Sequence, residues 1–400
     1  MENLKELFYR YNPWWEGDYD LKDIYDRQTI TSLLFKKLSS KDIMFLTGLR
    51  RVGKTTIFKL LIKKLIEDKN ISPNKIFYIS LDDYLLLKNS IIEIIEQYRK
   101  IHKISFSDKI YVFLDEITYK DEYEIQLKNL YDTGNIKIFA SSSSSSVLRS
   151  RKPYLIGRYS LTELLPLDFN EFLNFKKITI PKMDLNLIQE YFEDYMKTGG
   201  IPEYVLNGNI EYIKDLVDDV INKDIANLYK VRNIGILKDF FILLMERAGK
   251  QVSLNKIAKI LGISPDSSRR YFDMFVESYL IYTVLRCGKT NEKILSPKKV
   301  YAADLGIKSL FTGFRDLGSL FENYVYLKIK NLDPCYIYKD GFEIDFMTSD
   351  KTLIEVKYNS EMNPKQKYIF NSISSKNKIE IKNIYELNDF LKSSTDLLTQ

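Results

Sequence analysis

The hydrophobic positions of the first 165 residues fall into short, wholly apolar runs separated by helical stretches. The runs Ile43–Thr47, Lys75–Leu81, Ile110–Leu114 and Ile136–Ala140 are predicted to be strands. Because these runs are apolar throughout rather than alternating, we expect strands covered on both faces by helices. The pattern therefore predicts an α/β fold with a parallel sheet.

The pattern of apolar and polar positions divides the remainder of the chain into three further regions. Residues 166–233 have a helical pattern interrupted at Gly199–Pro202, residues 234–300 have three short helical patterns and then two β-like runs, and residues 301–400 mix strands with helices. We therefore predict four domains, which are 1–165, 166–233, 234–300 and 301–400. No internal repeat of solenoid length is present.

Composition narrows the class of protein. The 400 residues are 45% hydrophobic and 28% charged, as in globular rather than disordered proteins. No apolar run could cross a bilayer, and the charged opening residues argue against a signal peptide, so we expect a cytoplasmic protein without a membrane partner. Two cysteines cannot build a disulfide framework, and with one histidine they exclude a Cys/His zinc site. Any metal is therefore expected to be a hard ion such as Mg²⁺ or Mn²⁺, and the net charge of +6 permits nucleic-acid binding without requiring it.

The first predicted strand leads directly into a phosphate-binding motif. The segment GLRRVGKT matches G-x-x-x-x-G-K-[ST] and is followed by an amphipathic helix, which is the context that a P-loop requires. Lys54 is expected to reach the β- and γ-phosphates of ATP, and the Thr55 hydroxyl is expected to bind Mg²⁺. The alternative is an ordinary strand-to-helix turn. The expected nucleotide-binding residues are Gly48, Leu49, Arg50, Arg51, Val52, Gly53, Lys54, Thr55 and Thr56.

Acidic and polar residues follow the third and fourth predicted strands. Asp115 is expected to hold Mg²⁺, and Glu116 is expected to activate the attacking water, although Asp-Glu at a strand end can also cap a helix. Ser141 opens a tract of six serines and is the candidate sensor of the γ-phosphate, with a flexible serine loop as the alternative. Arg158 is a candidate arginine finger, acting in its own subunit or in a neighbour, and is otherwise a surface arginine.

These strings together resemble a known family. GLRRVGKTTIFKLL, FLDEI, SSSSVLRS, LIGRYSLTELLPLDFNEFL and YMKTGGIPEYV are similar to the AAA+-related P-loop ATPases common in archaea and bacteria. The resemblance implies a helical lid over 166–233, a winged-helix segment and a C-terminal restriction-endonuclease-like domain. The strand tip usually reads Thr-Gly-Ser in that family, whereas this chain has Ala140-Ser141-Ser142.

The third region has a helix–turn–helix pattern. Helices are predicted at Asp239–Ala248, Ser253–Leu261 and Pro265–Tyr279, followed by two strands of a wing. If this unit binds DNA, Arg269 and Arg270 would lie at the exposed start of the recognition helix. The alternative is a spacer or protein-contact module. Further lysines are expected to meet phosphates or to give the wing a positive edge, and these are Lys256, Lys259, Lys289, Lys293, Lys298 and Lys299.

The last region contains spaced carboxylates. Asp345 on one predicted strand and Glu355 on the next, with Glu322 on an upstream helix, would bind Mg²⁺ or Mn²⁺, and Lys357 would assist phosphodiester cleavage. The E…D…E-x-K spacing is similar to the PD-(D/E)xK nuclease site. Alternating Glu and Lys on a solvated strand is the alternative.

These patterns together favour a Mg²⁺-dependent ATPase that acts on DNA and assembles as a homo-oligomer, with a metal-dependent nuclease-like domain. One alternative is a nucleotide-switched DNA- or protein-binding regulator whose C-terminal domain does not cleave, and another is a promoter-binding regulator. The aromatic pair Trp14–Trp15 is expected to anchor the N-terminal segment on the ATPase core, with base stacking as the alternative.

Overall fold

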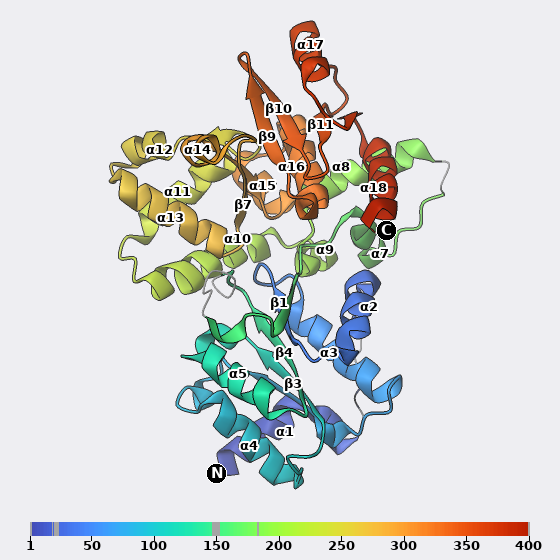
Figure 1. The fold of residues 1–400 in the computed structure, drawn as a ribbon, viewed down its shortest axis with the longest axis vertical. Helices are drawn as coiled ribbons and strands as arrows, with labels where there is room; N and C mark the ends of the chain where they lie inside the picture. Colours follow the sequence, from blue (N-terminus) through green and yellow to red (C-terminus); the bar gives the residue numbers. More distant parts are fainter. Residues whose placement is uncertain (1, 18, 20–23, 146–152, 182–183, 399–400) are drawn as a thin grey trace. The chain divides into compact units, whose positions relative to one another are not determined.

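The computed structural model contains two compact units, Met1–Leu165 and Pro166–Gln400 (Figure 1). The chain passes from the first unit to the second between Leu165 and Pro166, where the sequence pattern also changes. The further division of the second unit into lid, winged helix and nuclease-like domain stays a prediction. Residues not described are 1, 18, 20–23, 146–152, 182–183 and 399–400, which include Ser146 of the serine tract and Arg151–Lys152 before the candidate finger.

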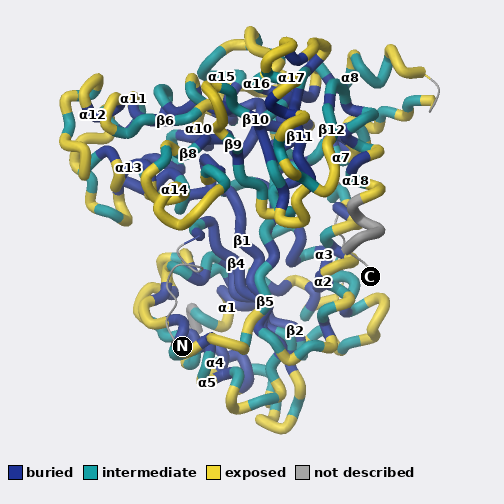
Figure 2. Tube along the Cα trace, turned by 45° about the horizontal axis from the view of Figure 1, so that its top comes forward, coloured by how far each residue is buried: buried dark blue, intermediate teal, exposed yellow. Residues whose placement is uncertain are grey.

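The first unit is built on a five-stranded parallel sheet. The strands lie in the order β2-β3-β4-β1-β5, and each adjacent pair is parallel. Their bounds are β1 Ile43–Thr47, β2 Ile76–Ser80, β3 Ile110–Asp115, β4 Ile136–Ser142 and β5 Tyr159–Glu163. The inner strands are buried almost throughout (Figure 2), which confirms the α/β fold and the parallel sheet. Strand β5 was not predicted because this edge strand is only partly buried.

Helices cover both faces of this sheet. On one face, Phe58 of α3 packs edge-on against Phe113 of β3, whose ring stacks on Phe139 of β4 at 4.4 Å. On the other face, Tyr98 of α4 stacks on Phe77 of β2 at 4.5 Å. The helices are α1 Glu2–Tyr11, α2 Gln28–Lys36, α3 Lys54–Glu67, α4 Ile91–His102 and α5 Tyr123–Thr133.

The N-terminal segment is fixed to the sheet by its tryptophans. The indole nitrogens of Trp14 and Trp15 both donate to the Ile76 carbonyl, at 3.2 and 2.9 Å. The Trp15 ring also stacks on Tyr98. These contacts confirm the prediction that the aromatic pair anchors the N-terminal segment.

The second unit combines helices with two sheets. Strands β6, β8 and β7 form an antiparallel sheet of that order, and β12-β11-β10-β9 form a mixed sheet in which only β11 and β12 are parallel. The helices are α7 Phe169–Phe175, α8 Leu185–Thr198, α9 Pro202–Asn207, α10 Ile210–Asp219, α11 Ile234–Met245, α12 Leu254–Leu261, α13 Pro265–Glu277, α14 Thr290–Leu295, α15 Leu305–Thr312, α16 Leu317–Ile329, α17 Pro364–Ser372 and α18 Ile384–Leu398, and a π-helix spans Val220–Asn227. The strands are β6 Gln251–Val252, β7 Ile281–Val284, β8 Lys298–Ala302, β9 Cys335–Lys339, β10 Phe342–Met347, β11 Thr352–Val356 and β12 Asn377–Ile381.

Two glycines, Gly200 after α8 and Gly306 in α15, allow three distant segments of this unit to meet. A Cβ at Gly200 would lie 2.1 Å from the Leu167 carbonyl oxygen, and a Cβ at Gly306 would lie 2.0 Å from the Thr198 carbonyl oxygen. The Gly200 amide donates to the buried Asp304 carboxylate at 2.6 Å, and Asp304 also caps α15. The break at Gly199–Pro202 is therefore a close backbone junction and not a surface turn.

The two cysteines are joined to each other. Cys287, after β7, and Cys335, at the start of β9, form a disulfide with a Cα–Cα distance of 5.1 Å. Backbone hydrogen bonds flank it, from the Cys287 amide to Tyr336 and from the Tyr336 amide to Leu285. The two cysteines therefore form one cross-link. A framework of several disulfides remains excluded, because the sequence has no other cysteine.

Candidate functional site

The P-loop lies at the carboxyl end of β1, in the inner part of the sheet. Gly48 has φ +140°, and a Cβ there would lie 2.2 Å from the Leu164 carbonyl oxygen. Gly53 has φ +100° and directly precedes α3, which starts at Lys54. The two motif glycines therefore serve different needs, since Gly48 permits close backbone approach and Gly53 permits a left-handed turn.

Lys54 is held inside this loop. Its ammonium group donates to the carbonyl oxygens of Gly48 at 2.9 Å and Leu49 at 3.0 Å, and the residue is buried. The side chain thus lies along the loop whose amides a P-loop directs at phosphate oxygens. The contact between Lys54 and phosphate stays a prediction.

Asp115 ends β3 next to the P-loop and receives three hydroxyl groups. Thr55 Oγ1 donates to Asp115 Oδ2 at 2.5 Å, Tyr78 OH donates to the same oxygen at 2.9 Å, and Ser141 Oγ donates to Oδ1. Burial, and then the charge of Asp115, raises the pKa of Tyr78. The adjacent oxygens of Thr55 and Asp115 suit a hard cation, and these are the two residues predicted to hold Mg²⁺.

Glu116 is oriented by the serines that follow β4. Its backbone is left-handed, with φ +51°, and its amide donates to Ser141 Oγ at 3.0 Å. Ser143 Oγ donates to Glu116 Oε1 at 2.6 Å. Ser141 therefore lies between the P-loop strand and the acidic pair, as predicted, because β4 continues to Ser142 and separates β3 from β1.

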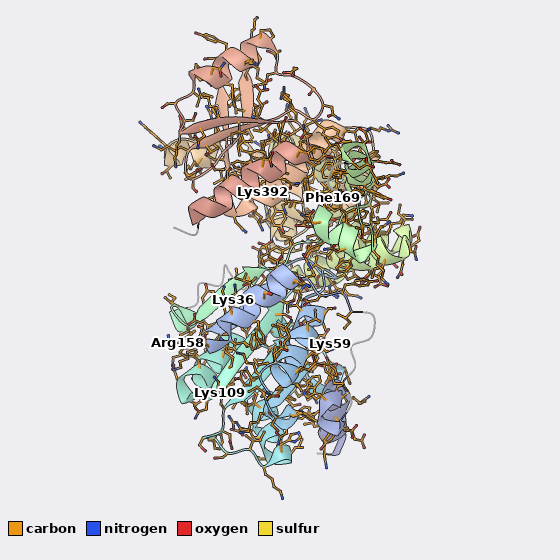
Figure 3. The ribbon with its side chains drawn as sticks, turned by 90° about the vertical axis from the view of Figure 1, so that its right-hand side faces the viewer. Lys36, Lys59, Lys109, Arg158, Phe169 and Lys392 are labelled. Atoms are coloured by element: carbon orange, nitrogen blue, oxygen red, sulfur yellow. A yellow bond between two sulfur atoms is a disulfide. The ribbon has the colours of Figure 1, made fainter. Side chains whose placement is uncertain are left out.

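Arg158 lies at the amino end of the sheet, opposite the end that carries the P-loop. Tyr159 pairs with Ile43 at the start of β1, and the Ile43 amide donates to the Arg158 carbonyl, so Arg158 precedes the sheet while the P-loop follows it. Its guanidinium pairs with Asp132 at 3.4 Å and lies 5.8 Å from the centre of the Tyr131 ring (Figure 3). This placement excludes contact between Arg158 and the P-loop of the same chain.

In the second unit, the hairpin of β10 and β11 joins the predicted carboxylates. The pairing of Phe346 with Ile354 sets Asp345 opposite Glu355, and the Asp345 amide approaches Glu355 Oε2 at 3.3 Å. Lys357 Nζ donates to Glu355 Oε1 at 2.5 Å, although Lys357 lies just beyond the strand. Asp345 Oδ2 accepts from the Val356 amide at 3.0 Å.

Three residues that we did not predict for this cluster complete it, and they are Lys299, Glu343 and Gln366. Lys299 Nζ from β8 contacts Glu322 Oε1 at 2.7 Å, Glu343 Oε1 at 2.6 Å and Asp345 Oδ1 at 3.2 Å. Gln366 Nε2 from α17 donates to Glu355 Oε1 at 2.6 Å. The prediction that Lys299 lies on an exposed wing edge is wrong, because its side chain is fully buried.

Burial controls the protonation of the cluster. It raises the pKa of both Glu322 and Glu355, and nearby Asp345 adds to the effect. Burial alone would lower the pKa of Lys299, but the surrounding carboxylates raise it above its ordinary value. Carboxylate oxygens suit a divalent ion, yet the described residues contain no group of three or more His, Cys, Asp or Glu placed to hold one.

The residues predicted to contact DNA are exposed. Lys256 and Lys259 lie on α12, and Arg269 and Arg270 lie in the first half of α13. Ser253 and Ser264 cap these two helices. Strand β6 precedes α12, and β7 and β8 follow α13, with α14 between them in the place of a simple wing loop.

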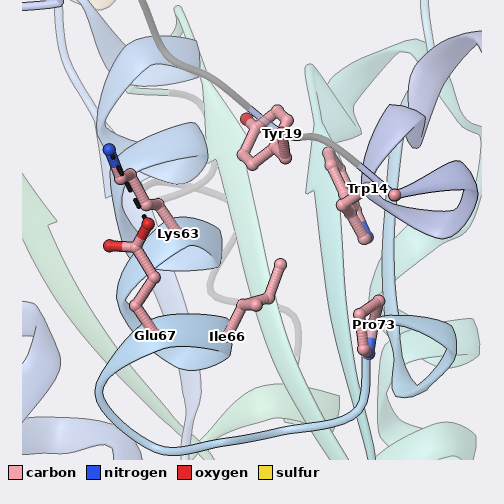
Figure 4. A pocket seen from close by; sticks show the side chains of 7 residues that line it. Trp14, Tyr19, Lys63, Ile66, Glu67 and Pro73 are labelled. Carbon is pink, nitrogen blue, oxygen red and sulfur yellow. Dashed lines mark ion pairs between the residues drawn. The ribbon is translucent and has the colours of Figure 1, made fainter.

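A pocket of about 270 Å³ lies elsewhere on the first unit (Figure 4). Trp14, Tyr19 and Pro73 line it together with the second half of α3, where Lys63 and Glu67 form an ion pair at 3.8 Å. Lys63 lies nine positions beyond Lys54, about 14 Å along the helix. This pocket is therefore separate from the P-loop.

Sequence reasoning missed Tyr78, Glu343 and Gln366, and it placed Lys299 on the wing and not in the carboxylate cluster. Tyr78 and Lys299 stand in apolar strand runs, where a polar residue needs a buried partner, and that mismatch was the available signal. No local pattern identifies the partner.

No helix in the part of the chain that the structure describes is long and apolar enough to span a bilayer.

Comparison with protein families supports the assignment of the first unit. Residues 40–173 match the model of an AAA domain, so this part of the chain has an AAA-type P-loop ATPase domain. Residues 189–317 match a family described only as a domain of unknown function (DUF8612). The second match assigns no activity to the helices or to the carboxylate cluster.

Relatives and solved structures extend over most of the chain. An uncharacterized protein of Methanocaldococcus jannaschii is 29% identical over 83% of this chain and 78% of its own length. A Walker-type ATPase of Pyrococcus abyssi is 16% identical, covering 73% of this chain and 97% of that chain, with a TM-score of 0.43. The ORC2 protein of Aeropyrum pernix is 14% identical, covering 78% and 97%, with a TM-score of 0.45.

Proposed function

We propose that the first unit binds and hydrolyses ATP with Mg²⁺. The observation that carries this proposal is the convergence of Lys54, Thr55, Asp115 and Glu116 at the carboxyl ends of β1 and β3, where Thr55 and Asp115 are in direct contact. Thr55 and Asp115 would hold Mg²⁺, which when bound supplies positive charge for the phosphate oxygens.

The residues of the chain have separable roles in this reaction. Lys54 exchanges its carbonyl partners in the loop for phosphate oxygens and neutralises their charge. Glu116, oriented by Ser143, accepts the proton of the attacking water. Ser141 links Asp115 to the Glu116 amide and so couples the metal-binding residue to the base.

Two substitutions separate binding from turnover. Lys54→Ala should abolish ATP binding or hydrolysis, whereas Glu116→Gln should still bind ATP and hydrolyse it slowly. Equilibrium binding of a fluorescent ATP analogue and phosphate release measure the two steps. Unchanged hydrolysis in Lys54→Ala would remove the P-loop from the mechanism, and normal turnover in Glu116→Gln would assign water activation to another residue.

The second unit is proposed to act on DNA. Exposed Lys256, Arg269 and Arg270 would meet DNA as parts of a winged helix, and Asp345, Glu355 and Glu322 would hold Mg²⁺ or Mn²⁺, with Lys357 assisting cleavage. Incubation with Mn²⁺ and branched, nicked or linear DNA tests this. Loss of cleavage in Asp345→Ala and Lys357→Ala, but not in exposed Lys351→Ala, is expected; DNA binding without cutting in any metal would refute the nuclease role.

One observation favours the alternative of a nucleotide-switched DNA- or protein-binding regulator. Lys299 already neutralises part of the carboxylate cluster, and Glu355 accepts from both Lys357 and Gln366. In this alternative, ATP controls assembly or partner binding, and the cluster has a structural role. A third possibility, a promoter-binding regulator, requires preference for one duplex sequence that weakens in Arg269→Ala.

We also propose that the protein assembles as a homo-oligomer in which Arg158 acts on a neighbour. Arg158 lies at the amino end of the sheet and its own P-loop lies at the carboxyl end, which supports action between subunits. Mixing Arg158→Ala with Lys54→Ala protein should partly restore hydrolysis, because one subunit would supply the arginine and the other the P-loop. No recovery would leave the Asp132 ion pair as the role of Arg158.

A further inference from the structure

Lys299 is the lysine of the carboxylate cluster whose side chain is completely enclosed, whereas Lys357 is partly exposed. Its side chain is 0% exposed, and its ammonium group lies within 3.2 Å of an oxygen of each of Glu322, Glu343 and Asp345. A buried ammonium group without partners is strongly unfavourable, so Lys299 can be buried here only because these carboxylates surround it. Lys299 therefore binds these three carboxylates as a cation would.

The strand that carries Lys299 is built to deliver it there. Lys299 and Tyr301 lie two positions apart on β8 and so share one face. Tyr301 OH donates to Glu322 Oε1 at 2.7 Å, the same oxygen that Lys299 contacts. The rings of Tyr301 and Phe346 lie 5.8 and 5.7 Å from the ammonium group, so the position has aromatic walls.

The formal charges of the cluster show what this cation changes. Four carboxylates, Glu322, Glu343, Asp345 and Glu355, face the two ammonium groups of Lys299 and Lys357. Of the four, Glu355 has Lys357 as its lysine partner, and the other three share Lys299. The position between Glu322 and Asp345 is thus already filled by positive charge from the protein.

We propose that Lys299 is a resident cation of the cluster, which positions Glu322 and Asp345 in the absence of a divalent ion and excludes such an ion from the space between them. The proposal rests on the proposed function, because it concerns how the nuclease-like cluster holds cations. It leaves the contact between Asp345 and Glu355 as the place for a divalent ion, so Glu322, one of the three carboxylates proposed above to hold metal, is not a ligand while Lys299 is in place. Lys299 acts through the carboxylates and is a positioning residue.

Replacing the ammonium group by an uncharged side chain of similar length tests this inference. Lys299→Met should lower the equilibrium constant for folding of the second unit about 10²–10³-fold, since it leaves three carboxylates without their cation. Mn²⁺ at millimolar concentration, without nucleotide, should recover most of that loss and should bind Lys299→Met at least tenfold more tightly than the unmodified chain. Tyrosine near-ultraviolet circular dichroism and titration calorimetry on the full chain measure both.

Two further variants make the test decisive. Lys298→Met changes the neighbouring lysine, which is only partly buried, and should show neither the loss nor the Mn²⁺ effect. Lys299→Met/Asp345→Asn removes one unpaired carboxylate and should recover at least tenfold in the folding equilibrium without metal. This second effect needs no metal site, so it supports the role of Lys299 even if the nuclease role fails.

The outcomes separate the two proposals. If Lys299→Met is as stable as Lys298→Met, or if neither Mn²⁺ nor Asp345→Asn improves its folding, Lys299 is not the cation of the cluster. If the unmodified chain and Lys299→Met bind Mn²⁺ equally tightly, and Asp345→Asn abolishes both, the metal site stands and the exclusion by Lys299 is overturned. Recovery by Asp345→Asn without Mn²⁺ binding in any variant supports Lys299 and refutes the metal-dependent function.

Discussion

The first glycine of the P-loop offers a direct test of how the motif is supported by the sheet. Gly48→Ala would place a methyl group 2.2 Å from the Leu164 carbonyl oxygen. Leu164 directly follows β5, and its amide donates to the Thr47 carbonyl. The two backbones would have to separate by about 1 Å, since closely packed interiors leave no room for the overlap. We expect overpacking and the φ of +140° together to cost about 2–6 kcal/mol of folding free energy.

A second glycine of the same motif is the matched control. Gly53 has φ +100°, but a Cβ there would meet nothing within 4 Å, so Gly53→Ala should cost only the backbone strain of about 1–3 kcal/mol. Gly134→Ala, also at positive φ and in open space, tests strain outside the P-loop. ATP binding should weaken in both P-loop variants and stay unchanged in Gly134→Ala.

Intrinsic fluorescence can follow this unfolding without a label. The chain has two tryptophans, Trp14 and Trp15, and both are fixed to β2 of the first unit. Urea denaturation followed by tryptophan fluorescence therefore reports the first unit and gives a separate midpoint for each variant. If Gly48→Ala and Gly53→Ala unfold at the same urea concentration, the close approach to Leu164 does not limit the P-loop, and the reasoning fails.

Three further predictions concern charge, cross-linking and catalysis. Burial lowers the pKa of Lys308 to about 8, so its charged form destabilises the fold fully below pH 8, and this destabilisation disappears as the pH rises to 10.5, the pKa of an unfolded lysine. Lys308→Met should therefore raise the free energy of unfolding by up to about 3 kcal/mol at pH 7. Urea titrations should show that this gain vanishes near pH 10.5. Reduction of the disulfide at Cys287, which closes a separation of 48 residues, should cost the second unit about 4 kcal/mol; unchanged thermal unfolding with dithiothreitol would contradict this. Ser143→Ala should slow ATP hydrolysis about tenfold without changing ATP affinity, because it frees Glu116; equal rates would show that this hydrogen bond does not orient the base.

Local pattern was sufficient for the parts of the fold that depend on short segments. The P-loop was recognisable because glycines, lysine and threonine occur at fixed spacing after an apolar strand. The adjacent Asp115 and Glu116 followed from the next acidic strand end. Strand bounds were less exact, as with β4, which continues through Ser142 because pairing with β1 extends the ladder beyond its apolar residues.

Contacts between distant segments could not be predicted in this way. Lys299 was assigned to the positive edge of the wing with Lys289, Lys293 and Lys298, yet its burial depends on carboxylates 23 to 46 positions away. Arg158 was proposed for its guanidinium chemistry, whereas the parallel pairing of β5 with β1 determines that it lies at the amino end of the sheet, away from the P-loop. Tyr78 reaches Asp115 only because β2 and β3 are neighbours, which composition does not encode.

The junction of Gly200, Leu167 and Asp304 also has a consequence for biosynthesis. The first unit has its last strand once residue 163 has left the ribosome, but the junction of the second unit requires residue 306. At bacterial translation rates of about 5–20 residues per second, the helices after Pro166 would wait roughly 7–30 seconds for their partner. A nascent chain stalled between these points should carry a finished amino-terminal body and an unfinished helical segment that chaperones can bind.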